Sequence, residues 1–162
     1  KHTISILVEN HAGVLARVAG LFARRGFNID SLAVGVTEDE KISRITIIAD
    51  GTAYTLEQIE KQLNKLIDVI KVRHLPAEEL LSRELVLIKV ACQPSQRAEL
   101  ISLAEIAKAK ISDITVNTMT LELSDSVPRI KTFEELLRPY GIKETVRTGS
   151  IAMQKGGASM KL

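Results

Sequence analysis

The segment ENHAGVLARVAGLFARRGFNID, residues 9–30, decides the fold of the first half of this chain. It follows a β-strand pattern at residues 3–8, in which Ile4, Ile6 and Val8 share one face. Residues 10–13 are typical of a loop, and Gly26 stands where a helix ends, after two arginines that suit its last turn. Between them, apolar residues repeat at helical spacing: Val14, Leu15, Val18, Leu21 and Phe22. A strand, a glycine loop and a helix start in this order can bind an anion.

The rest of the first half completes a βαββαβ order. Residues 27–36 predict a strand with a bulge or bend near Asp30-Ser31, where the alternation of apolar residues shifts phase. Residues 42–49 predict a strand that pairs with it as a hairpin. Residues 55–58, TLEQ, match a capping box, and residues 69–75 predict the fourth strand. The helix between them is expected to bury Leu56, Ile59, Leu63, Leu66 and Ile67.

The same order of elements repeats about 80 residues later. We expect a strand at 84–92, a helix capped by Ser95, a hairpin of 111–116 with 118–123, a helix at 127–137 ended by Gly141, and a last strand within 142–153. The two helices are expected to bury Leu100, Leu103, Ala104 and Ala107, and Ile130, Phe133, Leu136 and Leu137.

The predicted fold class is therefore α+β, with two tandem ferredoxin-like βαββαβ sandwiches. We expect a first domain at 1–75, a linker with one helical turn at 76–82, a second domain at 83–154 and a flexible tail at 155–162.

The composition excludes several classes of protein. The net charge of +2 is too balanced to indicate nucleic-acid binding, and aromatic residues make up only 3%. No apolar run reaches the ~18 residues of a membrane span. The single Cys92 excludes an internal disulfide and fits a reducing compartment. We expect a cytoplasmic protein, or a plastid protein in a plant or alga.

The sequence contains no recognisable catalytic or metal-binding pattern. His2, His11 and His74 are too scattered for a metal site, and Cys92 suits a small buried residue. There is no G-x-S-x-G elbow, and the glycines do not have P-loop or dinucleotide-binding spacing. We expect a chain without catalytic residues, metal or cofactor of its own.

The loop before the first helix is the candidate binding site. The backbone N–H groups of Gly13, Val14 and Leu15 would have no partner within the helix, and with the helix dipole they favour a carboxylate. Asn10 and Asn28 offer donors and acceptors that suit the ammonium and carboxylate of an amino acid. The alternative is purely structural: a helix cap, a tight turn and a strand edge. Spacing alone favours that alternative.

Longer stretches resemble a known family. ENHAGVLARVAGLFARRGFNIDSLAVG (9–35) resembles the opening of the regulatory (small) subunits of acetolactate synthase, also called acetohydroxyacid synthase. Further similar stretches follow in the same order: ISRITI (42–47), LEQIEKQLNKLIDVIKV (56–72), RELVLIKV (83–90) and PYGIKETVRTGSIAM (139–153). The resemblance covers essentially the whole chain, and the first half resembles an ACT domain, a βαββαβ module that binds amino acids.

The resemblance implies a regulatory subunit of branched-chain amino-acid biosynthesis. A separate catalytic subunit would carry thiamine diphosphate, Mg and FAD and make acetolactate from pyruvate. This chain would activate that subunit and confer feedback inhibition, usually by valine, with leucine or isoleucine as other candidate effectors. ACT domains pair side by side, so the resemblance also implies a homodimer with the effector at its interface.

The family pattern places effector contacts on specific residues of this chain. It maps Asn10, Gly13 and Asn28 onto contact positions, with the backbone of 12–15 around the carboxylate. The expected set is Asn10, His11, Ala12, Gly13, Val14, Leu15, Asn28 and Ile29. Leu32 and Ala33 are further candidates for the apolar wall, with core packing as the alternative. Ala12 stands where the family often has proline, which makes the loop less preorganised.

Three other functions are alternatives to this one. An ACT-type amino-acid sensor could regulate a different enzyme or act as a transcription regulator, but the sequence shows no DNA-binding segment. RNA-binding modules share the βαββαβ order, but they need aromatic residues on strands that here read RITIIA and LVLIKVAC. An enzyme on this scaffold lacks a catalytic cluster, and fold alone does not decide function.

Overall fold

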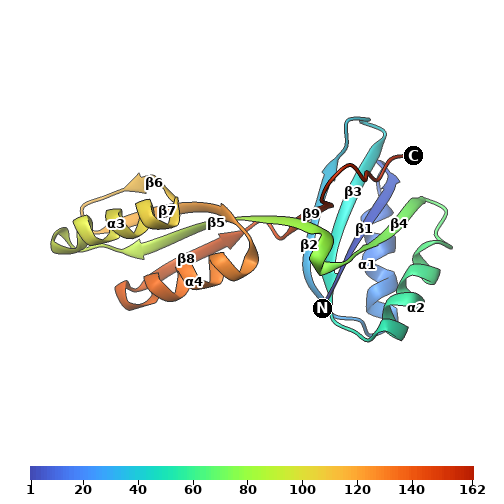
Figure 1. The fold of residues 1–162 in the computed structure, drawn as a ribbon, viewed down its shortest axis with the longest axis horizontal. Coiled ribbons are helices and arrows are strands. Elements are labelled where there is room, and N and C mark those ends of the chain that lie inside the picture. The colour runs from blue at the N-terminus through green and yellow to red at the C-terminus, as the bar shows by residue number, and fades with distance from the viewer. The chain divides into compact units, whose positions relative to one another are not determined.

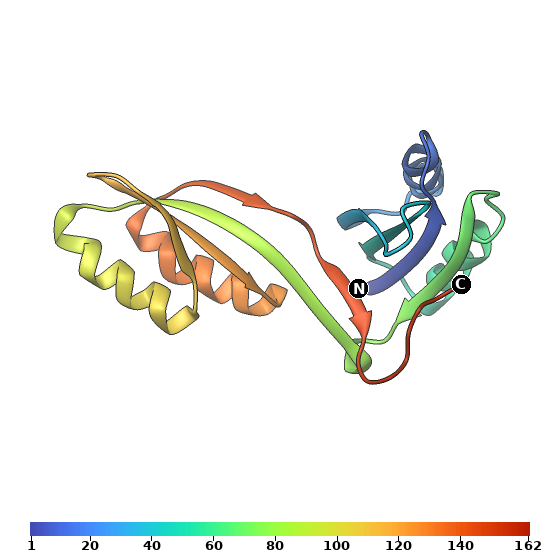
Figure 2. The same ribbon diagram turned by 90° about the horizontal axis from the view of Figure 1, so that it is seen from above.

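The computed structural model describes all 162 residues, and their contacts divide the chain into two compact units. The first unit comprises residues 1–81 and 150–162, and the second comprises residues 82–149. In each unit two helices cover one face of an antiparallel sheet (Figures 1 and 2). No helix has the length and apolar character needed to cross a membrane.

The first unit has the predicted βαββαβ order. Its elements are β1 (His2–Glu9), α1 (Val14–Arg24), β2 (Ile29–Val36), β3 (Ile42–Ala49), α2 (Ala53–Leu63) and β4 (Val69–Leu75). The strands lie in the order β2-β3-β1-β4, and every neighbouring pair is antiparallel. The two outermost strands are therefore β2 and β4.

Alternation along the strands divides their residues between the two faces of this sheet. Ile4, Ile6 and Val8 of β1 and Ile45 and Ile47 of β3 pack beneath α1 and α2 in one buried cluster. The residues between them, such as Ser5 and Arg44, therefore lie on the face without helices. The predicted irregularity in β2 is confirmed, because the β2–β3 register shifts between Ile29 and Ser31.

The second unit repeats the topology, which confirms the predicted fold class. Its elements are β5 (Leu80–Ala91), α3 (Arg97–Ala107), β6 (Lys110–Ile114), β7 (Thr118–Asp125), α4 (Val127–Leu137) and β8 (Ile142–Arg147). The strand order is β6-β7-β5-β8, and a second buried cluster lies under α3 and α4. Short 3-10 turns occupy Ala77–Glu79, Pro94–Gln96 and Arg138–Tyr140. A ninth strand, β9 (Ile151–Gln154), pairs with β5, whose first two residues belong to the first unit.

The beginnings of two helices differ from the prediction. Helix α2 begins at Ala53, because the Thr52 side chain accepts a hydrogen bond from the Thr55 backbone N–H at 3.2 Å, so the expected capping box at 55–58 is wrong. In the second unit Ser95 lies inside the 3-10 turn rather than at a helix cap, and α3 begins at Arg97.

Two residues expected in the core are exposed instead. Ile67 is 92% exposed, because α2 ends at Leu63 and the chain has left the helix before it. Leu136 is 48% exposed, whereas its neighbour Leu137 is buried. A 3.6-residue period identifies a helix face, but it does not show where that face stops being covered.

The end of the chain returns to the first unit. Residues 150–162 cluster with residues 1–81, whereas a second domain ending at 154 and a separate tail were expected. The contacts include hydrogen bonds from basic side chains to carbonyls of this segment: Arg44 to Ala152 at 2.8 Å, Lys71 to Lys161 at 2.7 Å and Arg73 to Ser159 at 3.2 Å. We call residues 150–162 the C-terminal strap.

Candidate functional site

The loop between β1 and α1 is shaped by Gly13. Its backbone lies in the left-handed region, at φ 88° and ψ −13°, and it precedes the first residue of α1. Residues with a side chain are strained there, which explains the glycine. A Cβ atom at this position would also lie 3.3 Å from Nη1 of Arg17. The guanidinium of Arg17 therefore lies against the backbone that was predicted to receive a carboxylate.

Asn10 fastens the same loop to the β2–β3 turn. Its backbone N–H donates to the Lys41 carbonyl at 2.8 Å, and its Nδ2 donates to the Glu40 carbonyl at 2.8 Å. Part of the donor capacity of Asn10 is thus used to hold the loop, and its side-chain oxygen is left as an acceptor.

A charged cluster that no sequence pattern indicated supports this loop. Asp68, which is buried, accepts from Nε of Arg17 at 2.6 Å and lies 2.9 Å from Nε2 of His11. Nε2 of His11 also lies 3.1 Å from the Glu9 carboxylate. The hydrogen bond of His11 with the Ala12 carbonyl and the two nearby carboxylates raise the pKa of this exposed histidine. Because Asp68 directly precedes β4, only the pairing of β4 with the end of β1 brings it here.

Three potential metal ligands meet in this cluster. One ligand atom from each of Glu9, His11 and Asp68 lies within 4.8 Å of the others. The guanidinium of Arg17 already pairs with Asp68 and would repel a metal ion placed there. We therefore assign the cluster an electrostatic role in fixing the loop.

The other part of the predicted site lies at the opposite end of the sheet. Ile29 pairs with Ala49, whereas Glu9 pairs with Ile42, and the seven residue steps from Ile42 to Ala49 along β3 span about 23 Å. Asn28 directly precedes Ile29, and its Nδ2 donates to Oδ1 of Asp30 at 2.8 Å. Within one chain the structure therefore groups Asn10, His11, Ala12, Gly13, Val14 and Leu15, and separates them from Asn28 and Ile29.

Two of the candidate apolar wall residues belong to the core of the first unit. Ile29 and Leu32 are partly buried and pack against the core of the first unit. Their place in the structure is explained by core packing. A ligand at the start of β2 could contact only the parts of them that remain exposed.

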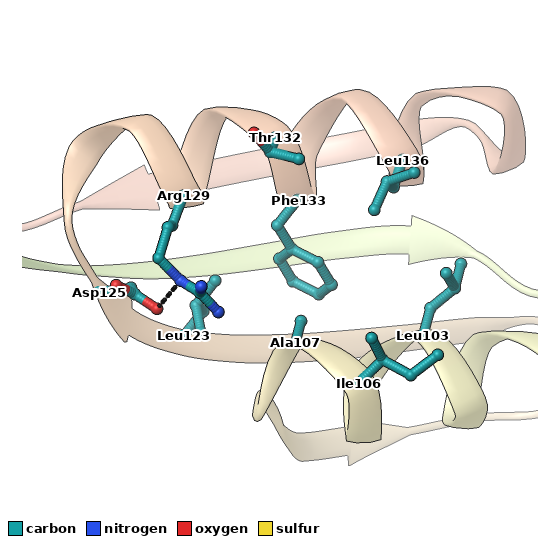
Figure 3. A pocket seen from close by; sticks show the side chains of 9 residues that line it. All are labelled: Leu103, Ile106, Ala107, Leu123, Asp125, Arg129, Thr132, Phe133 and Leu136. Atoms are coloured by element: carbon teal, nitrogen blue, oxygen red, sulfur yellow. Dashed lines mark hydrogen bonds and ion pairs between the residues drawn. The ribbon is translucent and has the colours of Figure 1, made fainter.

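The second unit contains an apolar groove between α3 and α4 (Figure 3). It has a volume of about 290 Å³ and is lined mainly by Leu103, Ala107 and Phe133, with Ile106 and Leu136 exposed beside them. Arg129 and Asp125 lie at one end and pair with each other through Nε at 2.7 Å, so they neutralise one another. Apart from this ion pair and Thr132 the lining side chains are apolar, so the groove offers packing surface.

Comparisons with known proteins cover nearly the whole chain. Residues 4–71 match the family model described as an AHAS small subunit-like ACT domain, and residues 83–156 match that of the small subunit of acetolactate synthase. A probable acetolactate synthase small subunit of Archaeoglobus fulgidus is 49% identical over 96% of this chain and 98% of its own length.

Two further relatives agree with this match. The acetolactate synthase small subunit of Mycobacterium leprae is 44% identical over 96% of this chain and 92% of its own length. The crystal structure of the acetolactate synthase small subunit from Thermotoga maritima has a TM-score of 0.91 at 39% identity, over 97% of this chain and 98% of that one.

Proposed function

Because this chain belongs to the acetolactate synthase small-subunit family, we propose that it activates a separate catalytic subunit and makes it sensitive to valine. The observation that carries the proposal is the similarity to small subunits along almost the full length of both chains. Thiamine diphosphate, Mg and FAD would belong to the catalytic subunit, which would act with this chain in the cytoplasm. This chain would form acetolactate only through that partner.

A homodimer through the ACT domain is part of the proposal. Strand β2 is an edge strand, and Val34 and Val36 on it are 46% and 63% exposed. Exposed apolar residues on a free strand edge favour pairing with another strand. Since Val34 and Val36 pair with Ile45 and Ser43, they lie on the face that carries the helices. Helix α1 of a second copy, paired along β2, would cover them.

This pairing would also join the separated parts of the predicted site. Two copies of β2 related by a two-fold axis run antiparallel, so the start of one lies opposite the end of the other. Asn28 stands at the start of β2, and the loop of Asn10 and Gly13 lies at the end where β2 finishes. Asn28 of one protomer would thus approach this loop in its partner. We propose that valine binds there, between two protomers, with its carboxylate at the start of α1.

The test is inhibition of the reconstituted enzyme by valine. Asn28 is exposed and its side chain bonds only to Asp30, so Asn28→Ala is expected to fold and to activate the catalytic subunit normally. Loss of one hydrogen bond to a charged ligand weakens binding by about tenfold or more. The valine concentration for half inhibition should rise by that factor.

The matched control is Asn64→Ala. Asn64 is also exposed and bonds within the chain, to the Glu60 carbonyl, but it lies at the end of α2. It should leave the inhibition curve unchanged. If Asn28→Ala activates normally and keeps the wild-type curve, valine is not held by this residue. If the wild-type chain does not raise the activity of the catalytic subunit, the regulatory role itself is wrong.

A further inference from the structure

Three basic side chains lie together on the helix-free face of the first sheet. Arg44 comes from β3, and Lys71 and Arg73 come from β4. They alternate with core residues such as Ile45 and Val72, which places them on the opposite face. None of the three forms an ion pair, and each donates a hydrogen bond to a carbonyl of the C-terminal strap.

The two arginines are close enough to affect one another. Burial, and then the positive charge of Arg73, lower the pKa of Arg44. A carbonyl oxygen carries only a partial charge, so the strap satisfies some donors but does not balance two guanidinium groups. An anion between them would remove this repulsion and use the remaining N–H groups.

A cavity of about 340 Å³ lies where such an anion would bind. It is lined by Arg44 and Arg73 on the sheet and by strap residues 153–154 and 156–161, with Glu38 as the one acidic side chain. This volume is at the lower end of small-molecule sites, about 300–1,000 Å³.

The strap contributes a glycine-rich loop to this cavity. Gly156 has a positive φ of 76°, and a Cβ added at Gly156 or Gly157 would meet nothing within 4 Å. Neither backbone N–H has a hydrogen-bond partner in the chain. Backbone N–H groups in a glycine-rich turn are a common arrangement for binding oxyanions, and both glycines line the same cavity as the two arginines.

The strap also leaves a buried polar group unsatisfied on the same face. Ser5 is fully buried, and its hydroxyl has no hydrogen-bond partner. In the sheet Ser5 lies between Thr46 and Arg73, its cross-strand partners on β3 and β4. A buried hydroxyl without a partner is costly, so the chain alone does not complete the polar contacts of this face.

We propose that this cavity binds a phosphate-type oxyanion, either free phosphate or the phosphate group of a small ester, between Arg44, Arg73 and the glycine loop. Two guanidinium groups and two loop N–H groups supply more hydrogen-bond donors than the two coplanar oxygens of a carboxylate can accept. A tetrahedral dianion has more acceptor oxygens and more charge, so it fits this set of donors better. The site is separate from the predicted valine site, which lies around the β1–α1 loop and the start of β2.

The experiment is a titration of the ¹⁵N-labelled full chain with inorganic phosphate at constant ionic strength, followed by NMR. The amide signals of Gly156 and Gly157 should shift along a saturable curve. Arg44→Gln and Arg73→Gln should each weaken binding by about tenfold or more, as expected for loss of a hydrogen bond to a charged group. Arg73→Lys keeps the charge and should weaken binding less.

Controls separate a specific site from a general effect of charge. Lys131→Gln removes an exposed cation from α4 of the second unit and should leave phosphate binding unchanged. Asn28→Ala should also bind phosphate normally, so this test is independent of the valine proposal. Methyl phosphate, titrated in parallel, distinguishes an ester site from one for free phosphate. The proposal is wrong if neither compound gives saturable shifts in the wild-type chain, or if sodium chloride at equal ionic strength reproduces them.

Discussion

Gly13 shows how one residue can serve both backbone geometry and the proposed site. Its φ of 88° places the chain in a conformation that costs other residues about 1–2 kcal/mol. A carboxylate introduced there as aspartate would add this strain to any effect on ligand binding. The exposed Asn28 is a cleaner probe, because its replacement alters neither the backbone nor the core.

The support of the loop by Asp68 leads to a prediction about Arg17. Asp68 is buried and pairs with Arg17 through both Nε and Nη2. Arg17→Gln should leave this carboxylate poorly compensated and lower the free energy of unfolding of the first unit by about 1–3 kcal/mol. Urea denaturation followed by NMR signals of that unit measures the loss.

Two further variants make this prediction specific. Lys61→Gln removes an exposed ion pair with Glu57 one helical turn away, and it should change the free energy of unfolding much less than Arg17→Gln does. Arg17→Gln combined with Asp68→Asn should recover part of the loss, because no buried charge then remains. Equal destabilisation by Arg17→Gln and Lys61→Gln would show that the buried pair contributes little.

At the scale of elements, the sequence predicts periodic segments better than their ends. β3, β4 and α4 have the expected bounds, because alternation and helical spacing extend over their whole length. The start of α2 was misplaced because both Thr52 and Thr55 can cap a helix, and the choice depends on the chain around them. The candidate site shows the same limit: the glycine loop is visible in the sequence, whereas Asp68 joins it only through strand pairing.

The free edge of β2 gives a prediction about the dimer. Val36→Lys places a charge on the edge that we expect to pair, and it should weaken dimerisation by about tenfold or more, measured by sedimentation velocity. Ile70→Lys is the control, because Ile70 is an exposed apolar residue on β4, the other outer strand. If Ile70→Lys disrupts the dimer and Val36→Lys does not, the interface lies at β4 and the proposed pairing along β2 is wrong.

At the scale of the whole molecule, the position of the C-terminal strap follows from long-range contacts that sequence periodicity does not reveal. The strap, residues 150–162, has little apolar periodicity, and glycine, lysine and serine in it are typical of a flexible end. It is held instead by the pairing of β9 with β5 and by hydrogen bonds from Arg44, Lys71 and Arg73, more than 80 residues earlier in the chain. Because the acceptors are backbone carbonyls, which every residue has, these bonds leave no pattern in the sequence of the strap.

From these contacts we predict that the first half folds when it is isolated but is less stable without the strap. The core cluster of the first unit contains no residue beyond position 81, so a fragment of residues 1–81 should fold. Leu7 is buried on the helix-free face, and β9 contacts β1 and β4, so removal of the strap would expose part of this face. Exposing one leucine side chain costs about 1.5–3 kcal/mol, and the fragment should be destabilised by at least part of that amount.

A synthetic peptide of residues 150–162 should restore this stability in trans. At about one hundred times its Kd it would raise the free energy of unfolding by about 2.7 kcal/mol, and the urea midpoint of the fragment should rise accordingly. A peptide of the same composition in scrambled order should have little effect, because its carbonyls would not follow Arg44, Arg73 and Lys71 in register across the sheet. If both peptides act equally, the attraction is only electrostatic. If neither acts although the fragment folds, the strap contributes no independent binding energy to the first unit.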